Sequence, residues 1–230
     1  MFINNKLTLN LNKTTFITFG SYQNSLPDAN FTVNISNHNL NRVYSCKYLG
    51  IYFDQFMRWD TQVIYIIKRV KYLLFIFYKL KHINKHILKI MYYSLFLGIV
   101  SYAISVWGCA YDNILKILQS FQNKILKIIR IDNCAFLNIK QLFRLNSLTY
   151  YYDDLTCLYQ NTKFSLRKDQ IKLPPIHKDI YKKSPFIVSL KLYNLLPTDA
   201  KKLNMSNSKA LKKKLLDFLL NISAFTIGNS

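Results

Sequence analysis

The 230-residue sequence contains no glutamate, and its 11 acidic residues are all aspartate. Thirty-two lysine and arginine residues oppose them, so the formal net charge at pH 7 is +21. A compact protein tolerates such a charge best beside a polyanion, which makes nucleic acid the expected partner and an anionic membrane surface the second candidate. Residue types with A/T-rich codons, such as Asn, Lys and Ile, are abundant. Part of the charge is therefore attributed to genome composition rather than to binding.

Cysteine is scarce as well, and its four positions exclude two kinds of small scaffold. Cys46, Cys109, Cys134 and Cys157 are widely separated, with no Cys-x-x-Cys pair and no histidine cluster after them. Neither a disulfide framework nor a zinc finger is indicated, and we expect free thiols in a reducing compartment. The first residues also lack the pattern of a secretory signal. We therefore expect an intracellular protein of the cytoplasm or nucleus, not a secreted one.

Two arrangements that carry chemistry are also missing. The sequence has five glycines, shows no glycine-rich phosphate loop, and shows no nucleophile–base arrangement. His82 and His86 lie one helical turn apart, but no cysteine or carboxylate accompanies them, so we expect exposed side chains rather than metal ligands. We predict no metal site and no cofactor for this chain.

Residues 90–111 carry no charge, and this run is long enough to cross a bilayer, for which about 20 apolar residues are needed. It nevertheless contains less apolar residues, among them Tyr92, Tyr93, Ser94, Gly98, Ser101, Tyr102 and Ser105. These residues lower its hydrophobicity and favour a buried helix with polar contacts. A membrane span at 90–111 stays open as the less favoured alternative.

The pattern of apolar residues changes along the chain from strand-like to helical. Alternation at 13–19, 31–35 and 43–53 predicts a small antiparallel sheet of two to four strands. Apolar residues then recur every three or four positions, which predicts helices at 59–80, 84–107 and 113–130, followed by shorter helices after Cys134. The polar, basic segment 161–183 is typical of a linker or surface arm, and a basic amphipathic helix is expected at 208–220. The predicted fold class is α+β, a small sheet followed by a mainly helical bundle and a basic C-terminal arm.

The stretch TYYYDDLT at 149–156 spells the tyrosine-x-Asp-Asp box that holds metal in reverse transcriptases. In a polymerase such carboxylates meet two metal ions roughly 3.5–4 Å apart and sit in a tight strand turn. Here the surrounding apolar residues have helical spacing, which places Asp153 and Asp154 on the opposite, solvated face. Neighbours on a helix diverge by about 100°, so the two cannot share a metal pair. We interpret them as an exposed acidic pair without a catalytic role.

Several other motifs, in one order, resemble the end of a LINE-type, non-LTR retrotransposon reverse transcriptase of the jockey-like kind. The similar segments cover nearly the whole chain: 4–19, CKYLGIYFD at 46–54, RWDTQV at 58–63, 92–108, LQSFQNKILKIIR at 118–130 and LKLYNLLP at 190–197. The resemblance implies an RNA-directed DNA polymerase and divides the chain into palm strands with a primer-grip hairpin (1–57), a thumb (58–160) and a C-terminal extension (161–230). The chain departs from the family at Ser189 and Tyr193, where relatives often carry Gly and Trp, and has no C-terminal cysteine–histidine knuckle.

In the family the metal-binding aspartates and their two Mg²⁺ ions belong to the part of the polymerase before Lys13, so this chain alone is expected to lack the catalytic carboxylates. The resemblance implies three kinds of role for the residues present. Lys13 would lie near the triphosphate, or be a solvated lysine beside a strand. Tyr48, Leu49 and Gly50 would form the primer grip, or a simple strand bend. Lys116, Lys124, Lys127 and Arg130 would contact the template–primer backbone, or form an ordinary solvated helix face.

The resulting hypothesis is a polymerase fragment whose own role is nonspecific binding of RNA and DNA, with the missing upstream half as a further partner. Two alternatives stay open: a small membrane protein that spans at 90–111, and a nonfunctional transposon relic.

Overall fold

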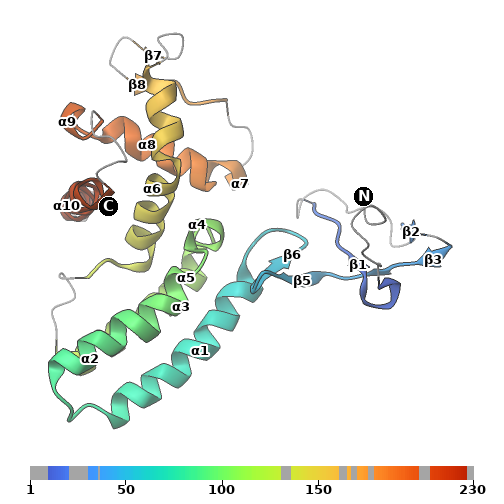
Figure 1. Cartoon of the computed structure of the whole chain (residues 1–230), viewed down its shortest axis with the longest axis horizontal. Helices are drawn as coiled ribbons and strands as arrows, with labels where there is room; N and C mark the ends of the chain where they lie inside the picture. The colour runs from blue at the N-terminus through green and yellow to red at the C-terminus, as the bar shows by residue number, and fades with distance from the viewer. Residues whose placement is uncertain are drawn as a thin grey trace. The chain divides into compact units, whose positions relative to one another are not determined.

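The computed structural model covers all 230 residues and describes residues 10–20, 31–35, 37–130, 136–160, 165–166, 170–175, 179–201 and 208–226. The chain divides into two compact units, residues 1–65 and 66–230. It is mostly helical with small two-stranded sheets, which confirms the predicted α+β class with a helical bundle (Figure 1).

The described part of the first unit begins with a 3-10 turn, η2 (Leu11–Lys13), and continues with short strands. The strands are β1 (Thr15–Phe16), β2 (Asn34–Ile35), β3 (His38–Asn39), β4 (Asn41–Arg42), β5 (Ser45–Tyr48) and β6 (Ile51–Asp54). β2–β3 and β5–β6 pair antiparallel, whereas β1 and β4 pair parallel. These ladders are separate, unlike the single antiparallel sheet that alternation predicted. The strands of β2 and β3 are two residues long and fully exposed, so they have no common face to bury.

The β5–β6 hairpin closes with a two-residue turn at Leu49 and Gly50. Tyr48 pairs with Ile51, and both turn residues have positive φ, 47° for Leu49 and 81° for Gly50. Two successive residues of positive φ are what the tight hairpin turns that match strand twist require, and glycine accepts this conformation without strain. The predicted extended run 43–53 is therefore a hairpin.

Asp54 organises the loop between this hairpin and the first long helix, α1 (Asp60–Lys79). Its Oδ1 accepts hydrogen bonds from the backbone N–H of Phe56 (3.1 Å) and Arg58 (3.0 Å), and its Oδ2 from that of Trp59 (2.8 Å). The loop needs such support because Met57 and Trp59 have positive φ, 52° and 67°, which costs energy in residues with a Cβ. The carboxylate thus fixes the backbone where α1 begins.

The second unit is built from helices. They comprise the rest of α1, α2 (Lys85–Met91), a π-helical segment η3 (Tyr92–Leu97), α3 (Gly98–Ser101), α4 (Ile104–Trp107), α5 (Asp112–Ile129) and α6 (Ile139–Gln160). Asn84 caps α2 by accepting a hydrogen bond from the N–H of His86, as expected from its position. After Cys134, itself outside the described residues, the structure has the 22-residue α6 in place of the predicted shorter helices. No glycine or proline interrupts this stretch of sequence.

The uncharged segment 90–111 is not one continuous helix, contrary to the prediction of a helix over 84–107. The helix stops at Ser101, Ala103 takes a left-handed conformation (φ 49°), and α4 follows. The indole Nε1 of Trp107 donates to the carbonyl of Tyr102 at 2.9 Å, which satisfies a group that the break leaves outside the helical ladder. Among the described residues, including all of 90–111, no helix has the length and apolar character needed to span a membrane.

The C-terminal third packs on α6. Its elements are β7 (Ser165–Leu166), β8 (Gln170–Ile171), α7 (Asp179–Lys182), α8 (Pro185–Leu195), α9 (Thr198–Lys201) and α10 (Ser208–Thr226). Their buried side chains share one core with Leu148, Tyr152 and Leu155 of α6, to which α10 contributes Leu211, Leu215 and Leu219. Residues after 160 thus belong to the same compact unit as the helices before them. Of the predicted arm 161–183, residues 161–164, 167–169 and 176–178 lie outside the described residues.

Candidate nucleic-acid interface

The four basic residues singled out on α5 are all exposed. Lys116, Lys124 and Lys127 lie on the face opposite the buried Leu118 and Ile125, and Arg130 follows as the left-handed C-cap of the helix (φ 58°). The amphipathic pattern that predicted α5 thus also predicted which side of it meets solvent.

The structure brings two of these four basic residues together with a residue of another helix. Lys124 and Lys127 border an open groove of about 620 Å³ between α5 and α1, and Lys71 borders it from α1. The rest of its lining is apolar or aromatic: Leu74, Phe75 and Tyr78 of α1, and Ile128 of α5. Lys116 and Arg130 are not among the lining residues. We call this feature the α1–α5 groove.

Aromatic side chains stand on the exposed side of α1, where an amphipathic helix ordinarily carries polar residues. Tyr72, Phe75 and Tyr78 follow one another at three-residue steps and are 68%, 54% and 61% exposed. Successive side chains at this spacing lie along the same side of a helix. Sequence analysis did not single out these aromatics, although their place in the polar half of the helical repeat was a usable signal.

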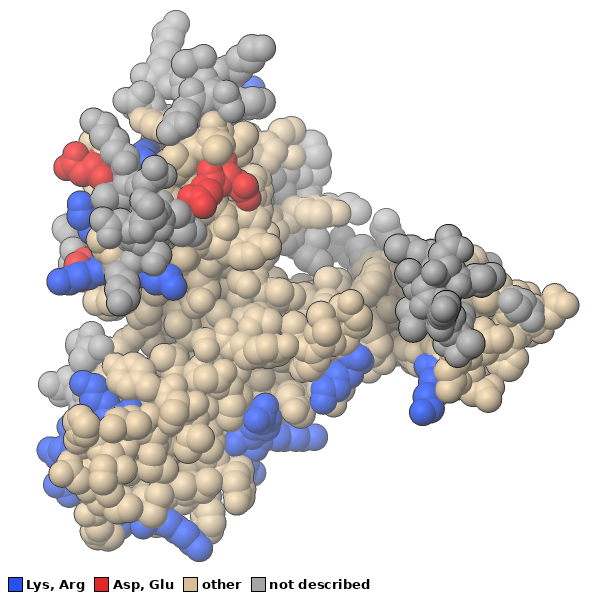
Figure 2. All heavy atoms as spheres, in the orientation of Figure 1, with Lys and Arg blue, Asp and Glu red and all other residues tan. Residues whose placement is uncertain are grey.

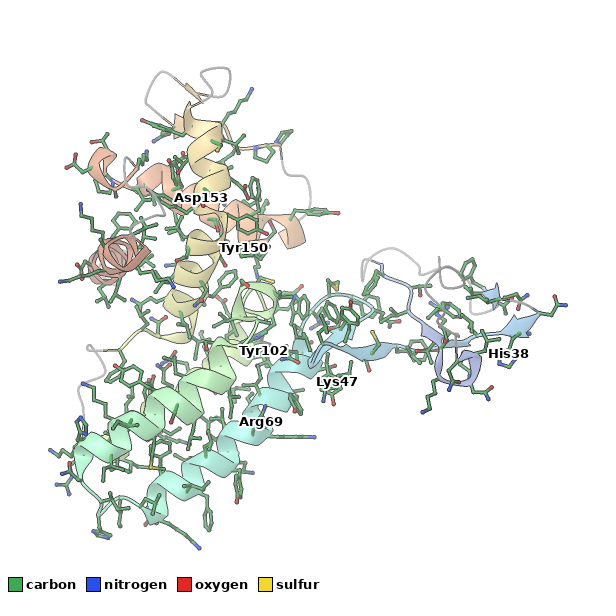
Figure 3. All side chains as sticks on the ribbon, in the orientation of Figure 1. His38, Lys47, Arg69, Tyr102, Tyr150 and Asp153 are labelled. Carbon is green, nitrogen blue, oxygen red and sulfur yellow. The ribbon has the colours of Figure 1, made fainter. Side chains whose placement is uncertain are left out.

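Cations and aromatic rings alternate along this surface. The Nζ of Lys79 lies 4.6 Å from the ring centroid of Phe75, and that of Lys81 lies 4.7 Å from the ring of Tyr78. Further basic residues of α1, Lys68 and Arg69, are exposed, and Figure 3 labels Arg69 on this helix. Figure 2 shows blue basic atoms along α1 and α2, while the red acidic atoms of this view lie in the region of α6, α9 and α10, where blue atoms are present too. Such a surface can pair with phosphates and stack on bases.

The candidates of the first unit lie on its surface. Lys13 is exposed at the end of η2. Tyr48 and Leu49 are 64% and 73% exposed at the tip of the β5–β6 hairpin, and Gly50 completes the turn. The geometry is that of a projecting hairpin, and the roles near a triphosphate or a primer end stay predictions.

Asp153 and Asp154 are exposed and lie within α6, away from any strand turn (Figure 3). The neighbouring Tyr152 points the other way: its side chain is fully buried, and its hydroxyl donates to the carbonyl of Ala200. Burial, followed by the nearby Tyr193, raises the pKa of Tyr152 to about 12. Tyr152, the last of the three tyrosines in TYYYDDLT, is thus a core residue that ties α6 to α9.

In the part of the chain that the structure describes, no group of three or more His, Cys, Asp or Glu side chains could hold a metal ion. His82 and His86 are exposed. Of the cysteines, Cys46 and Cys109 are half-buried, Cys157 is exposed, and these three form no disulfide with one another.

Compared with protein-family models, curated proteins and solved structures, the chain matches none of them.

Proposed function

We propose that this chain binds RNA or DNA without sequence preference and that the α1–α5 groove is the contact surface. The observation that carries the proposal is the convergence of Lys71, Lys124 and Lys127 on a groove whose walls include Phe75 and Tyr78. Lysine side chains neutralise phosphates and release condensed counterions, while aromatic rings stack on unpaired bases of any identity. Neither contact distinguishes one base sequence from another, so the binding is independent of sequence.

The resemblance to a non-LTR reverse transcriptase supports the same conclusion from another side. In that family the segment that contains α1 to α5 would be the thumb, which faces the backbone of the template–primer duplex. In polymerases of that family, two Mg²⁺ ions and the catalytic aspartates would belong to a part upstream of the segment that this chain resembles. The role left to this chain is to hold nucleic acid, and an isolated preparation is expected to incorporate no nucleotides.

The test is equilibrium binding of a fluorescent RNA–DNA hybrid and a fluorescent single-stranded RNA, measured by anisotropy over a series of salt concentrations. The variant Lys71→Gln/Lys124→Gln/Lys127→Gln removes the three charges of the groove. The slope of log K against log salt is negative, and each lost phosphate contact reduces its magnitude by about 0.7 to 0.9. The slope of the triple variant is therefore expected to be smaller in magnitude by about 2.

A matched control separates the groove from net charge. Lys212→Gln/Lys213→Gln/Lys214→Gln removes three exposed charges from α10, a helix that does not line the groove. If both triple variants lose the same affinity and slope, the binding reflects overall charge, and the groove is not the site. All six lysines are exposed, so both variants are expected to melt like the parent chain, which circular dichroism checks.

A further inference from the structure

A second pocket lies in the helical unit, away from the residues of the α1–α5 groove. It has a volume of about 370 Å³ and forms where the end of α4 and the start of α5 meet α6, α7 and α8. This volume is within the range of about 300 to 1,000 Å³ that small-molecule sites occupy. We call it the α6–α8 pocket.

Charge is distributed very unevenly around the α6–α8 pocket. One carboxylate, that of Asp112, lines it. Five cationic side chains line it as well: Lys140, Arg144, Lys182, Lys183 and Lys191. The Nζ of Lys140 lies 2.7 Å from an oxygen of Asp112, so this carboxylate has one cation as its direct partner. The pocket therefore carries a surplus of positive charge, which concentrates anions near it.

The surrounding positive charge lowers the pKa of Asp112. The hydrogen bond from Lys140 lowers its pKa, and the charges of Lys140, Lys183 and Lys116 lower it further. Lys183 is also close to an aromatic ring, with its Nζ 4.7 Å from the ring centroid of Tyr111. Cations from α5, α6 and the segment between α7 and α8 thus act on Asp112.

The remainder of the lining is apolar. Leu115, Phe143 and Leu192 are 3%, 6% and 6% exposed and contribute to the pocket wall from three different helices. Gly108 lets this wall close up, because a Cβ there would lie 2.6 Å from a ring carbon of Phe143 and 2.6 Å from the carbonyl oxygen of Ile104. The pocket consequently offers an apolar wall beside a cationic one, in a packed part of the core.

We propose that the α6–α8 pocket binds a phosphomonoester joined to a flat apolar body, either a free mononucleotide or the 5′-phosphorylated end of a nucleic-acid strand. A phosphomonoester carries a charge of about −1.5 to −2 at pH 7 and three acceptor oxygens, which suits a site with several cations better than a carboxylate does. The guanidinium of Arg144 can hold two phosphate oxygens at once, and lysines supply the remaining charge. The base of the nucleotide packs against the apolar wall of the pocket.

Cys109 provides a direct readout because it lines the pocket and is half-buried. The full-length chain is treated with iodoacetamide, and mass spectrometry follows alkylation at Cys109, with Cys46 and Cys157 as internal references. At an AMP concentration ten times its Kd, alkylation of Cys109 is expected to slow about tenfold, while the references keep their rates. Adenosine, which lacks the phosphate, is expected to give little protection. Calorimetric titration with AMP reports binding even where Cys109 reacts slowly.

A paired substitution tests the cations themselves. Arg144→Gln/Lys191→Gln is expected to abolish protection by AMP, while Lys212→Gln/Lys213→Gln, which removes the same charge from α10, keeps it. The groove variant Lys71→Gln/Lys124→Gln/Lys127→Gln is expected to keep it too, so this inference and the proposed function fail independently. Arg144 is half-buried and Lys191 exposed, and thermal melting confirms that the pocket variant is folded.

The two sources of the phosphomonoester are distinguished with short RNAs that carry either a 5′-phosphate or a 5′-hydroxyl. Protection by the phosphorylated RNA at lower concentration than AMP assigns the pocket to strand ends, and the reverse order assigns it to free nucleotides. Three results would overturn the proposal: equal protection by adenosine and AMP, unchanged protection in the Arg144→Gln/Lys191→Gln variant, or no binding of any of these phosphates.

Discussion

The side-chain nitrogen of Gln122 lies 2.9 Å from the hydroxyl oxygen of Tyr92, and both side chains are almost completely buried. The same nitrogen donates to the carbonyl of Leu137 at 2.7 Å, so one amide connects α5 with η3 and with the segment that precedes α6. The ring of Tyr92 stacks on that of Phe96 and meets that of Phe136 edge-on. A π-helical turn, a rare conformation, is thus held by one polar bridge within an aromatic cluster.

Removal of the hydroxyl of Tyr92 should destabilise the fold measurably. Tyr92→Phe keeps the ring and its packing but deprives Gln122 of one of its two acceptors, for which we expect a loss of about 1 kcal/mol. The measurement is the midpoint of urea unfolding. Tyr93→Phe is the control, because that side chain is 47% exposed and should change the midpoint little. Equal midpoints for the two variants would show that the bridge contributes nothing.

Two buried tyrosines should make the stability fall at alkaline pH. Burial raises the pKa of Tyr92 and of Tyr152 to about 12, from the ordinary value of 10. In the unfolded chain these hydroxyls lose their protons near pH 10, whereas the folded state keeps them, so their contribution is complete below pH 10 and is lost as pH rises from 10 to 12.

The matching measurement compares urea unfolding of parent, Tyr92→Phe and Tyr93→Phe at pH 9, 10 and 11. Lysine titration affects all three alike. The decline should be shallower in Tyr92→Phe than in the other two, and an identical decline in all three would contradict the assignment.

Helix positions were predictable where the apolar period was strong. The repeat predicts helices at 59–80 and 113–130, and the structure has them at Asp60–Lys79 and Asp112–Ile129. The break at Ala103 was not predictable, because alanine favours helix and no glycine or proline marks the position. At the break the carbonyl of Tyr102 accepts a hydrogen bond from the indole of Trp107, a contact that the apolar period of the sequence does not encode.

The candidate sites, too, were predictable only in part. Exposure of the lysines on α5 follows from the helical period, whereas the groove they share with Lys71 depends on which helices pack together. The α6–α8 pocket draws cations from segments widely separated in sequence, and no local pattern joins Lys140 to Lys191. Sequence periodicity orients a side chain relative to its own helix, and tertiary packing decides which side chains meet.

The exposed aromatics of α1 should matter for single strands more than for duplexes. Phe75→Ala and Tyr78→Ala are expected to weaken binding of single-stranded RNA by about 1 to 3 kcal/mol for each base that loses its stacking partner. Binding of a fully paired hybrid should change less, because its bases are already stacked on one another. Tyr150→Ala, which removes a 72% exposed ring from α6, serves as the control. Equal losses on both ligands would exclude base stacking as the role of these rings.

The acidic pair on α6 should contribute neither to metal binding nor to the stability of the fold. Because Asp153 and Asp154 are exposed on a helix, Asp153→Asn/Asp154→Asn is expected to change the free energy of unfolding by no more than about 0.5 kcal/mol. Titration with Mn²⁺, followed by its paramagnetic effect on water relaxation, should be the same for parent and variant. A Mn²⁺ site lost in the variant would restore the polymerase interpretation of TYYYDDLT.

Asn194 should control how firmly the C-terminal segment is attached to the helical unit. Its amide Oδ1 accepts from the N–H of Ile171 and its Nδ2 donates to the carbonyl of the same residue, each at 2.9 Å. This pairing replaces the partners that the backbone of β8 lacks at its edge, and Ile171 itself is 3% exposed.

Asn194→Ala removes both bonds and leaves two backbone groups unsatisfied, so we expect a loss of about 2 kcal/mol. Native-state hydrogen exchange locates the effect, since exchange at the Ile171 amide should accelerate more than tenfold while that of Ile125 in α5 keeps its protection. Asn123→Ala, in an exposed residue of α5, is the matched substitution and should leave both amides unchanged. If Ile171 exchanged at the same rate in both variants, side-chain burial rather than the Asn194 pairing would be what holds this segment in place.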